Sequence, residues 1–334
     1  MTRGAQPTIL LTGGAGYIGS HIALALKDLG QPVVILDNFV TGSRKLVPEG
    51  VPLVEADCAD RATVAETVRT HGVDTVIHCA GLISVTESVR EPLLYYTSNV
   101  GNAVALFDAA LAGGAKHILF SSTATVYGAP DAPSLDEDLP LAPVNPYAAS
   151  KAMVERVLGD LVATGRASVG VLRYFNVAGA DPAGRAGQIS KEATHLIKIA
   201  AEAAVGKRPG VLVTGTDFPT PDGTGVRDYI HVSDLASAHV AAVARLREGV
   251  PSFTVNVGYG QGSSVLDVLD CVDRAIGRKI PRSDAPRRPG DVARLVANPA
   301  RAHKLLGWTP AHANLDTIVR DAIAWERKLA EAGN

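Results

Sequence analysis

Tyr147 and Lys151 are the two residues whose types and spacing best fit a chemical role. They stand four positions apart, and residues at that spacing share one face of a helix. Asn145 and Pro146 precede them, a pair that favours the start of a helix at this point. We expect the Lys151 ammonium to favour the phenolate and so to lower the pKa of Tyr147 from about 10 towards neutrality. A tyrosine in that state is a general acid or base for an alcohol or sugar hydroxyl.

Hydroxyl side chains fill the segment before this helix. Residues 120–128 read FSSTATVYG and continue an apolar run at 117–121 that we predict as a strand. Open α/β sheets bind ligands at the carboxyl ends of their strands, so one of these hydroxyls is expected to face the substrate. A Tyr-x-x-x-Lys spacing on its own occurs on many helices without a function. Its place after this strand end favours catalysis.

A glycine-rich turn follows the first predicted strand, Thr8–Thr12. Gly14, Gly16 and Gly19 in the segment TGGAGYIGS have the spacing of a dinucleotide-binding turn. Glycine is needed there because a Cβ atom would hold the backbone away from the pyrophosphate, which binds the N–H groups at the start of the next helix. The pattern therefore predicts a bound dinucleotide.

An acidic residue about 20 positions further on bears on which dinucleotide binds. Asp37 ends the second predicted strand, where its carboxylate accepts hydrogen bonds from the adenosine ribose hydroxyls. The same carboxylate repels the 2′-phosphate of NADP, so NAD is the expected cofactor. Arg44 and Lys45 lie slightly further along the loop and leave a phosphate contact open.

Short apolar runs alternate with amphipathic stretches through the first half of the chain, which predicts repeated β-α-β units. We therefore expect an α/β fold of Rossmann type, a doubly wound parallel sheet with a smaller mixed α/β lobe that binds substrate. The sheet domain is assigned to residues 1–176, completed by about 227–255, and the lobe to 177–226 and 256–334. The predicted strands are 8–12, 33–37, 52–56, 75–79, 117–121, 168–174, 211–214 and 253–257, and the helices after residue 175 are 190–205, 233–246, 263–276 and 315–330.

The composition is that of an ordinary globular protein. The 334 residues include 32 basic and 34 acidic side chains, a net charge of -2, which excludes a large electrostatic footprint for nucleic acid. The apolar stretches end well short of the roughly 18–20 residues of a membrane span, and no secretory signal is visible, so we expect a cytoplasmic protein without membrane contact. Cys58, Cys79 and Cys271 show no ligand spacing, and no metal site is predicted.

Seven segments together resemble the extended short-chain dehydrogenase/reductase family, and within it the members that epimerise UDP-sugars. They are TGGAGYIGSH (12–21), DTVIHCAGL (74–82), SSTATVYG (121–128), NPYAASK (145–151), LRYFNVAGA (172–180), DGTGVRDYIHVSDLA (222–236) and RRPGD (287–291). The resemblance implies a homodimeric, NAD-dependent enzyme that inverts C4 of a UDP-hexose through a transient 4-keto sugar. It also implies a catalytic set of Thr123, Tyr147 and Lys151.

Two sets of binding residues are implied by the same resemblance. The NAD set is Gly13, Gly16, Tyr17, Ile18, Gly19, Asp37, Asn38, Asp57, Cys58, Cys79, Ala80, Gly81, Ser98, Tyr147, Lys151 and Phe175. The UDP-sugar set is Thr123, Asn176, His195, Leu196, Arg227, Arg288, Asp291 and Leu295. Arginine suits a diphosphate because its forked donors match the phosphate oxygens.

Some positions depart from the family pattern. Thr123 stands where serine is more usual and keeps the hydroxyl, Ser98 replaces the first of two asparagines, and Ile83 stands where some members have lysine. His195 occupies the place of a substrate-side asparagine and is expected to contact the diphosphate. Leu295 is of intermediate size at a position that limits the room around sugar C2, which leaves N-acetylated sugars open.

Other activities fit the same core. Epimerases of UDP-N-acetylhexosamines, UDP-pentoses or UDP-uronates share it, and a non-catalytic NAD sensor would keep the fold without the chemistry. The intact catalytic pair argues against a sensor. A nucleotide-sugar dehydratase is disfavoured, because the Asp-Glu pair that such members carry after the catalytic threonine is Ala124 and Thr125 here. The helices expected at 92–112 and 146–163 would form the dimer interface.

Overall fold

A seven-stranded sheet forms the centre of the protein in the computed structural model, which describes residues 6–189, 194–288 and 291–332. The strands follow the order β10-β6-β5-β4-β1-β2-β3, and every neighbouring pair is parallel. The chain thus starts in the middle of the sheet and winds outward in both directions, which confirms the predicted doubly wound fold. The strands are β1 (Thr8–Thr12), β2 (Val33–Asp37), β3 (Leu53–Glu55), β4 (Val73–His78), β5 (His117–Thr123), β6 (Ser168–Tyr174) and β10 (Phe253–Val257).

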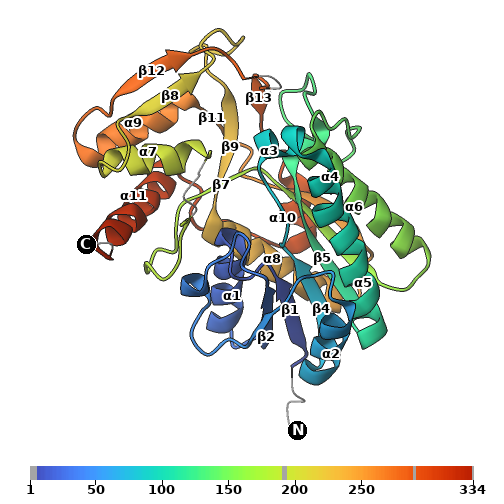
Figure 1. Ribbon diagram of the computed structural model, residues 1–334. Helices are drawn as coiled ribbons and strands as arrows, with labels where there is room; N and C mark the ends of the chain where they lie inside the picture. The colour runs from blue at the N-terminus through green and yellow to red at the C-terminus, as the bar shows by residue number, and fades with distance from the viewer. Residues whose placement is uncertain (1–5, 190–193, 289–290, 333–334) are drawn as a thin grey trace.

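Helices cover both faces of this sheet (Figure 1). Strands covered on both faces are apolar in continuous runs, and in β1 Ile9 and Leu11 pack against one helical layer while Leu10 packs against the other. The first layer contains α1 (Tyr17–Asp28), α8 (Val232–Arg247) and α10 (Ala300–Leu306). The second contains α2 (Arg61–His71), α5 (Asn102–Gly113) and α6 (Pro146–Ala163), with α3 (Val85–Arg90) and α4 (Pro92–Tyr95) beside α6.

The helical stretch predicted at 92–112 is not uniform. Between α4 and α5 the chain widens into a π-helical segment at Tyr96–Gly101. The buried Asn99 of this segment binds the backbone of Leu82, where its Oδ1 accepts from the amide N at 2.8 Å and its Nδ2 donates to the carbonyl O at 3.0 Å. Widened turns of this kind are frequent at functional sites, and this one aims Asn99 at the loop after β4.

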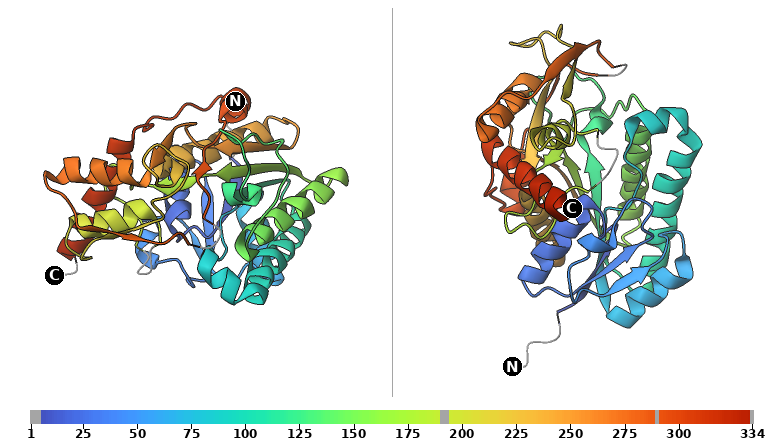
Figure 2. Two further views of the ribbon diagram at one scale, coloured as in Figure 1. Left: turned by 90° about the horizontal axis from the view of Figure 1, so that it is seen from above. Right: turned by 60° about the vertical axis from the view of Figure 1, so that its left-hand side comes forward.

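The smaller lobe lies over the edge of the sheet opposite the N-terminus (Figures 1 and 2). Its central strand, β9 (Val226–His231), pairs in parallel with β7 and β13 and antiparallel with β11, so this sheet has both parallel and antiparallel pairs. The remaining strands are β7 (Asn176–Ala178), β11 (Gly262–Ser264) and β13 (Arg294–Leu295), with β8 (Val211–Thr214) and β12 (Arg282–Ala285) as a separate parallel pair.

Three helices close the smaller lobe around a core of their own. They are α7 (Leu196–Ala204), α9 (Val265–Ile276) and α11 (Leu315–Ala332). In α11 the predicted apolar residues Ile318, Ala322 and Trp325 are all buried. The helix predicted at 190–205 is present as α7, and its expected first residues, 190–193, lie outside the described residues. Within the described ranges, no helix is both long and apolar enough to cross a membrane.

The chain passes from the large sheet to the smaller one after β6 and after β10, and it returns after β9. β6 leads through Phe175 into β7, and β9 leads into α8, which packs on the large sheet before β10 joins its edge. Thr123 at the end of β5 is in register with Tyr174, and Asn176 of β7 is in register with Tyr229 of β9. The carboxyl ends of β5 and β6 therefore face the smaller lobe.

Candidate active site

The turn between β1 and α1 has the close packing that a dinucleotide-binding turn requires. Gly13 has a φ of +72°, and a Cβ atom there would lie 2.6 Å from the amide N of Ala80. At Gly19 a Cβ would lie 2.1 Å from the carbonyl O of Gly13. Among the described residues no side chain caps α1, so the first N–H groups of this helix are available to an anion such as a pyrophosphate. The residues predicted for this turn are Gly13, Gly16, Tyr17, Ile18 and Gly19.

Asp37 lies beside this turn at the end of β2. Its side chain is buried, with Oδ2 accepting from the amide N of Ala15 at 3.0 Å and Oδ1 accepting from that of Phe39 at 2.8 Å. An ionised carboxylate accepts about four hydrogen bonds, so these two backbone contacts fix its position and leave lone pairs for ribose hydroxyls.

The nearby basic residue Arg44 is turned towards protein groups. Its guanidinium forms an ion pair with Glu55 at the end of β3 and lies 4.4 Å from the centre of the Phe39 ring. The arrangement places a carboxylate, and not this arginine, against the glycine turn. Electrostatics at the turn therefore favour a free ribose hydroxyl over a 2′-phosphate.

Further predicted residues lie at the neighbouring strand ends. Asp57, which follows β3, accepts hydrogen bonds from the Nδ2 atoms of Asn38 at 2.7 Å and Asn102 at 3.0 Å. Asn102 was not predicted, because it reaches this point from α5 and carries no local motif. The other predicted residues here are Cys58 after β3 and Cys79, Ala80 and Gly81 after β4.

The loop after β4 is held against the helix that carries the predicted catalytic pair. Asn99, which binds the backbone of Leu82, also donates from Nδ2 to Ser150 Oγ at 3.0 Å. A Cβ at Gly81 would lie 3.0 Å from Asn99 Oδ1, so glycine is needed where the loop passes this side chain. Sequence reasoning singled out the half-buried Ser98 and missed Asn99, its neighbour, which makes these contacts.

α6 begins where the sequence predicts and carries Tyr147 and Lys151 on one face. Asn145 precedes the helix in an extended conformation, and its Oδ1 accepts from the amide N of Ala148 at 2.9 Å. Pro146 takes the first helical position, where its missing N–H costs no hydrogen bond. The start of the helix, and with it the position of the tyrosine one residue later, is thus set by local sequence.

The three predicted catalytic residues come together at the end of β5. The Lys151 side chain is buried, its Nζ donates to the carbonyl O of Ser121 at 3.1 Å, and it lies 4.9 Å from the centre of the Phe120 ring. The Tyr147 side chain hydrogen-bonds with that of Thr123. A phenol, a hydroxyl and an ammonium therefore share the carboxyl edge of the sheet.

The expected effect of Lys151 on Tyr147 is wrong for the protein alone. Burial raises the pKa of Tyr147 to about 12, although the hydrogen bond with Thr123 lowers it. Burial also lowers the pKa of Lys151 to about 8, opposed by the interactions with Cys79 and Glu155. The Lys151 ammonium donates to a backbone carbonyl, and desolvation of the phenolate is the largest influence on the pKa of Tyr147. The phenolate therefore needs a further positive charge.

A buried ion pair that sequence reasoning missed supports this arrangement. Glu155 lies one helical turn after Lys151, and its side chain pairs with Arg173 of β6, with Oε2 2.6 Å from Nη2 and Oε1 3.1 Å from Nε. The two side chains are 7% and 8% exposed. Glu155 also accepts a hydrogen bond from Ser122, the neighbour of Thr123. The pair joins α6 to the ends of β5 and β6.

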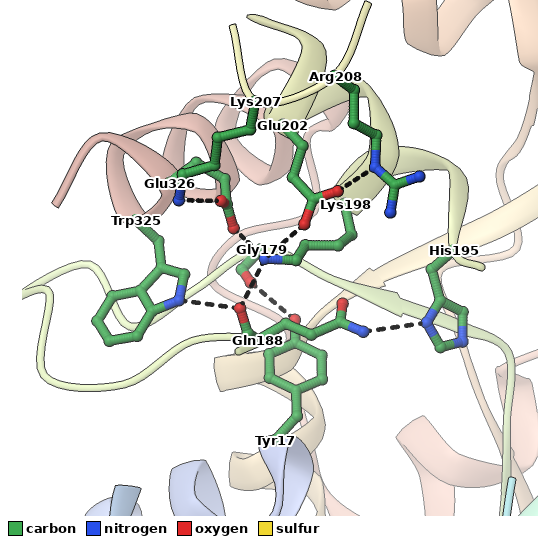
Figure 3. Close-up of polar contacts among 10 residues, drawn as sticks. All are labelled: Tyr17, Gly179, Gln188, His195, Lys198, Glu202, Lys207, Arg208, Trp325 and Glu326. Atoms are coloured by element: carbon green, nitrogen blue, oxygen red, sulfur yellow. Dashed lines mark hydrogen bonds and ion pairs between the residues drawn. The ribbon is translucent and has the colours of Figure 1, made fainter. Parts of the chain in front are cut away.

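A pocket in the smaller lobe, between β7, β9, α7 and α11, gathers several predicted residues. It is lined by Asn176, His195 and Leu196, all of them predicted, and also by Lys198, Tyr229 and Glu326, which were not. Figure 3 shows the His195 ring facing Gln188, which lies between it and a group of charged side chains, with Tyr17 approaching from α1. The Tyr17 hydroxyl donates to the carbonyl O of Gly179, in the pocket lining, at 2.7 Å.

The predicted arginine cluster forms next to this pocket. Arg227, on β9, is largely buried, and burial together with the positive charge of Arg288 lowers its pKa, whereas Tyr229 and Asp291 act in the opposite direction. Arg288 is 60% exposed, with its Nε 3.5 Å from Asp291 Oδ2 and its Nη2 donating to Thr214 at 3.1 Å. Guanidinium groups suit a diphosphate, because their forked donors match the phosphate oxygens.

Phe175 and Leu295 belong to one buried cluster behind Thr123. Leu295, on β13, is in register with Arg227 of β9 and is 8% exposed. Phe175 is 7% exposed and packs with Ala124 in the same cluster. Among the described residues, no group of three His, Cys, Asp or Glu side chains is placed to hold a metal ion.

A doubly wound sheet with a glycine turn at its first helix, a tyrosine and lysine pair at its carboxyl edge and a second lobe over that edge defines a dinucleotide-dependent enzyme of the extended short-chain dehydrogenase/reductase class. The model of the NAD dependent epimerase/dehydratase family matches residues 9–258. The chain belongs to this family.

Its relatives agree over almost their full length. A UDP-glucose 4-epimerase of Azospirillum brasilense is 51% identical over 329 residues, which cover 98% of this chain and 94% of the relative. A UDP-glucose 4-epimerase of Bacillus subtilis is 42% identical, covering 95% and 96%. Among solved structures, a UDP-glucose 4-epimerase of Stenotrophomonas maltophila with bound NAD and formylated UDP-arabinopyranose matches with a TM-score of 0.95 at 39% identity, covering 98% and 100%.

Proposed function

We propose that this protein is a UDP-glucose 4-epimerase, an isomerase that uses NAD to interconvert UDP-galactose and UDP-glucose. The observation that carries this proposal is the position of Tyr147, Thr123 and Lys151. They meet at the carboxyl edge of the large sheet, where β5 ends and α6 begins. Relatives at 40–51% identity bear the same name.

In the reaction that we propose, Tyr147 takes the proton of the sugar 4-hydroxyl and later returns it after the opposite face of C4 has been presented. Bound NAD supplies a reversible acceptor for the C4 hydride and a positive charge that favours the phenolate. Thr123 binds the sugar 4-hydroxyl through its side-chain oxygen, and Lys151 keeps a positive charge near Tyr147. The sugar passes through a 4-keto form with no net redox change.

Inversion requires the nucleotide to stay in place while the sugar turns. Arg227 and Arg288 are the residues that we assign to the diphosphate, with Asn176 and His195 in the lining of the pocket. Charge-assisted hydrogen bonds of this kind are stronger than the neutral hydrogen bonds of a sugar. Such an arrangement anchors the UDP moiety and leaves the hexose free to rotate.

The proposal is tested by incubating the purified protein with UDP-galactose, without added nicotinamide nucleotide, and following UDP-glucose by NMR. We expect UDP-glucose to appear, because the hydride returns to the sugar in every cycle and a retained cofactor is not consumed. A protein that needs fresh NAD for each turnover, or that shows no conversion even with NAD, would contradict the proposal.

The same assay decides among the other sugars. A solved relative from Campylobacter jejuni is a UDP-Glc/GlcNAc 4-epimerase, matched at a TM-score of 0.84 and 39% identity. Leu295 lies in the buried cluster near Thr123 and is the residue that we assign to the space around C2. Turnover of UDP-N-acetylgalactosamine by the wild type and by Leu295→Tyr shows whether this position limits access, and equal rates would remove it from that role.

Asp37 is the residue that we assign to the adenosine ribose. We expect Asp37→Ala to weaken NAD binding by about 10- to 100-fold, in line with the loss of hydrogen bonds to a charged group. We also expect the preference for NAD over NADP to narrow, because the repelling carboxylate is gone. Calorimetric titration of cofactor-stripped protein measures both effects.

The matched control for this experiment is Glu55→Ala. Glu55 ends the neighbouring strand β3, and its exposed carboxylate pairs with Arg44 instead of the glycine turn. Its NAD affinity should stay within about twofold of the wild type, since an exposed ion pair contributes little. Similar losses in both variants would show that the effect at Asp37 is general and not specific to the ribose.

We also propose a cytoplasmic homodimer with a role in galactose metabolism. Apolar side chains gather on the outer surface of α3 to α6, where Val89 is 64%, Leu93 78% and Met153 47% exposed. A second copy that packs α5 and α6 against this surface would cover them. We expect Leu93→Glu to give a monomer in sedimentation, whereas Leu212→Glu, at an exposed position of the other lobe, should leave the dimer intact.

A further inference from the structure

A buried cluster of charges joins α7 to the C-terminal helix α11, and two of its members, Lys198 and Glu326, line the substrate pocket (Figure 3). Lys198 of α7 is 7% exposed and Glu326 of α11 only 1% exposed, and the two are in direct contact. Glu326 also pairs with Lys207 at 3.0 Å, and Lys198 lies 3.3 Å from Glu202, which pairs with Arg208. Three cations and two carboxylates thus form one connected network.

The Lys198 ammonium forms an ion pair with Glu202. It also donates to the carboxylate of Glu326 and to the carbonyl O of Gln188 at 3.0 Å. The Trp325 indole N–H donates to the same oxygen at 3.1 Å. A Cβ at Gly187 would lie 2.5 Å from the Trp325 ring, so the chain passes as close to α11 as glycine permits.

Gln188 connects the charged cluster to His195 in the substrate pocket. Its side-chain Nε2 donates to Nδ1 of His195 at 3.3 Å, and both residues line the pocket together with Asn176. Figure 3 shows the Gln188 side chain reaching from the charged cluster to the imidazole. The backbone of Gln188 is thus held by α7 and α11, while its amide holds a residue that we assign to the substrate.

The contact determines what His195 offers to a ligand. Because Nδ1 accepts a hydrogen bond, the proton of a neutral imidazole lies on Nε2, which is then a donor. Surrounding protein atoms disfavour the charged ring and lower the pKa of His195, which favours the neutral imidazole. A neutral N–H donor is suited to a phosphate oxygen of the sugar nucleotide.

Stability alone does not explain a lysine at this place. Apolar residues of similar volume often stabilise a core as well as, or better than, a buried ion pair. Lys198, held by its ion pair, donates a hydrogen bond to the Gln188 carbonyl, which an apolar residue does not do. The charged cluster also has no direct contact with Tyr147, so its effect on the reaction would pass through substrate binding.

We propose that Lys198 is a positioning residue for the sugar nucleotide: held by Glu326 of the C-terminal helix, it fixes Gln188 and through it the His195 imidazole at the pocket. This inference rests on the proposed function. α11 thereby contributes to substrate affinity although it lies far along the chain from every predicted catalytic residue.

The test compares UDP binding and turnover in three variants of the holoenzyme. Lys198→Met keeps the length of the side chain and removes its donors, and Glu326→Gln removes only the charge that holds it. Arg208→Gln is the matched control, because Arg208 belongs to the same network and does not contact Gln188. Folding should survive, since in Lys198→Met Glu326 still pairs with Lys207 and Glu202 with Arg208, and in Glu326→Gln Lys198 still pairs with Glu202.

We expect Lys198→Met to raise the Kd of UDP and the KM of UDP-galactose about tenfold, with kcat within about threefold of the wild type. Glu326→Gln should raise both about threefold, and Arg208→Gln should change neither. Should Lys198→Met fail to fold, Glu326→Gln carries the test. Unchanged UDP affinity in Lys198→Met and Glu326→Gln, or a fall in kcat at constant KM, would overturn the inference.

A double-mutant cycle with His195→Ala separates positioning from general support. If Lys198 acts through the imidazole, Lys198→Met should change UDP affinity by less than about twofold once His195 is absent. Additive losses would contradict the proposed route. Failure of the wild type to bind UDP would instead reject the proposed function, so the two failures are distinguishable.

Discussion

Tyr147→Phe is expected to lower kcat about a thousandfold, because the substitution removes the only group that we assign to proton transfer at the sugar 4-hydroxyl. The phenyl ring keeps the volume and the packing of the tyrosine at the start of α6. The amount of NAD retained after gel filtration and the Kd of UDP should therefore stay close to those of the wild type. NMR of the UDP-galactose reaction measures the rate.

Tyr96→Phe is a suitable control for this substitution. Tyr96 begins the π-helical segment, a part of the chain that packs against α6, and its hydroxyl has no assigned part in the reaction. Its kcat should be within about twofold of the wild type. If Tyr147→Phe kept most of its activity, another residue would have to carry the proton, and the proposed mechanism would be wrong.

Arg173→Met is expected to cause the largest loss of stability, about 3–5 kcal/mol in the free energy of unfolding. The substitution leaves the carboxylate of Glu155 buried without its partner, and the Tyr127 hydroxyl loses the donor that lies 2.9 Å away. Because Glu155 lies one turn from Lys151, we also expect reduced turnover. Urea unfolding of the holoenzyme, with the same NAD and UDP concentrations throughout, measures the change.

Two comparisons test whether burial of the pair is the cause. Arg156 follows Glu155 on α6 and pairs with Asp160, and the two side chains are 80% and 66% exposed. Arg156→Met should therefore lower the free energy of unfolding by less than about 1 kcal/mol. The double variant Arg173→Met with Glu155→Gln should recover part of the loss, because no uncompensated charge remains. Equal losses for the buried and exposed pairs would show that burial of the pair is not the cause.

Local sequence patterns were sufficient to predict most of the framework. The alternation of apolar strands and amphipathic helices predicted the doubly wound sheet, and the structure confirms it. The same holds for the start of α6, because Asn145 and Pro146 act only on the backbone of the next few residues. Spacing therefore placed Tyr147 and Lys151 on one helix face without any knowledge of tertiary contacts.

Other features depended on contacts between distant residues. Burial raises the pKa of Tyr147, whereas a prediction from the neighbouring lysine alone lowers it. The role of Asn99 depends on the π-helical segment, which turns its side chain towards Leu82. In both cases the decisive quantity, the exposed area or the facing group, is a property of the packed chain.

The sequence by itself determined the kind of chemistry, the fold and the cofactor turn, since each follows from residues that are neighbours along the chain or from a periodic pattern. Only the tertiary structure decided which side chains support that chemistry. Lys198 and Glu326 are 128 positions apart and Arg173 and Glu155 are 18 apart, and neither pair has a spacing that signals contact. Ion pairs of this kind form because folding removes both partners from water at one place, and no local pattern encodes that place.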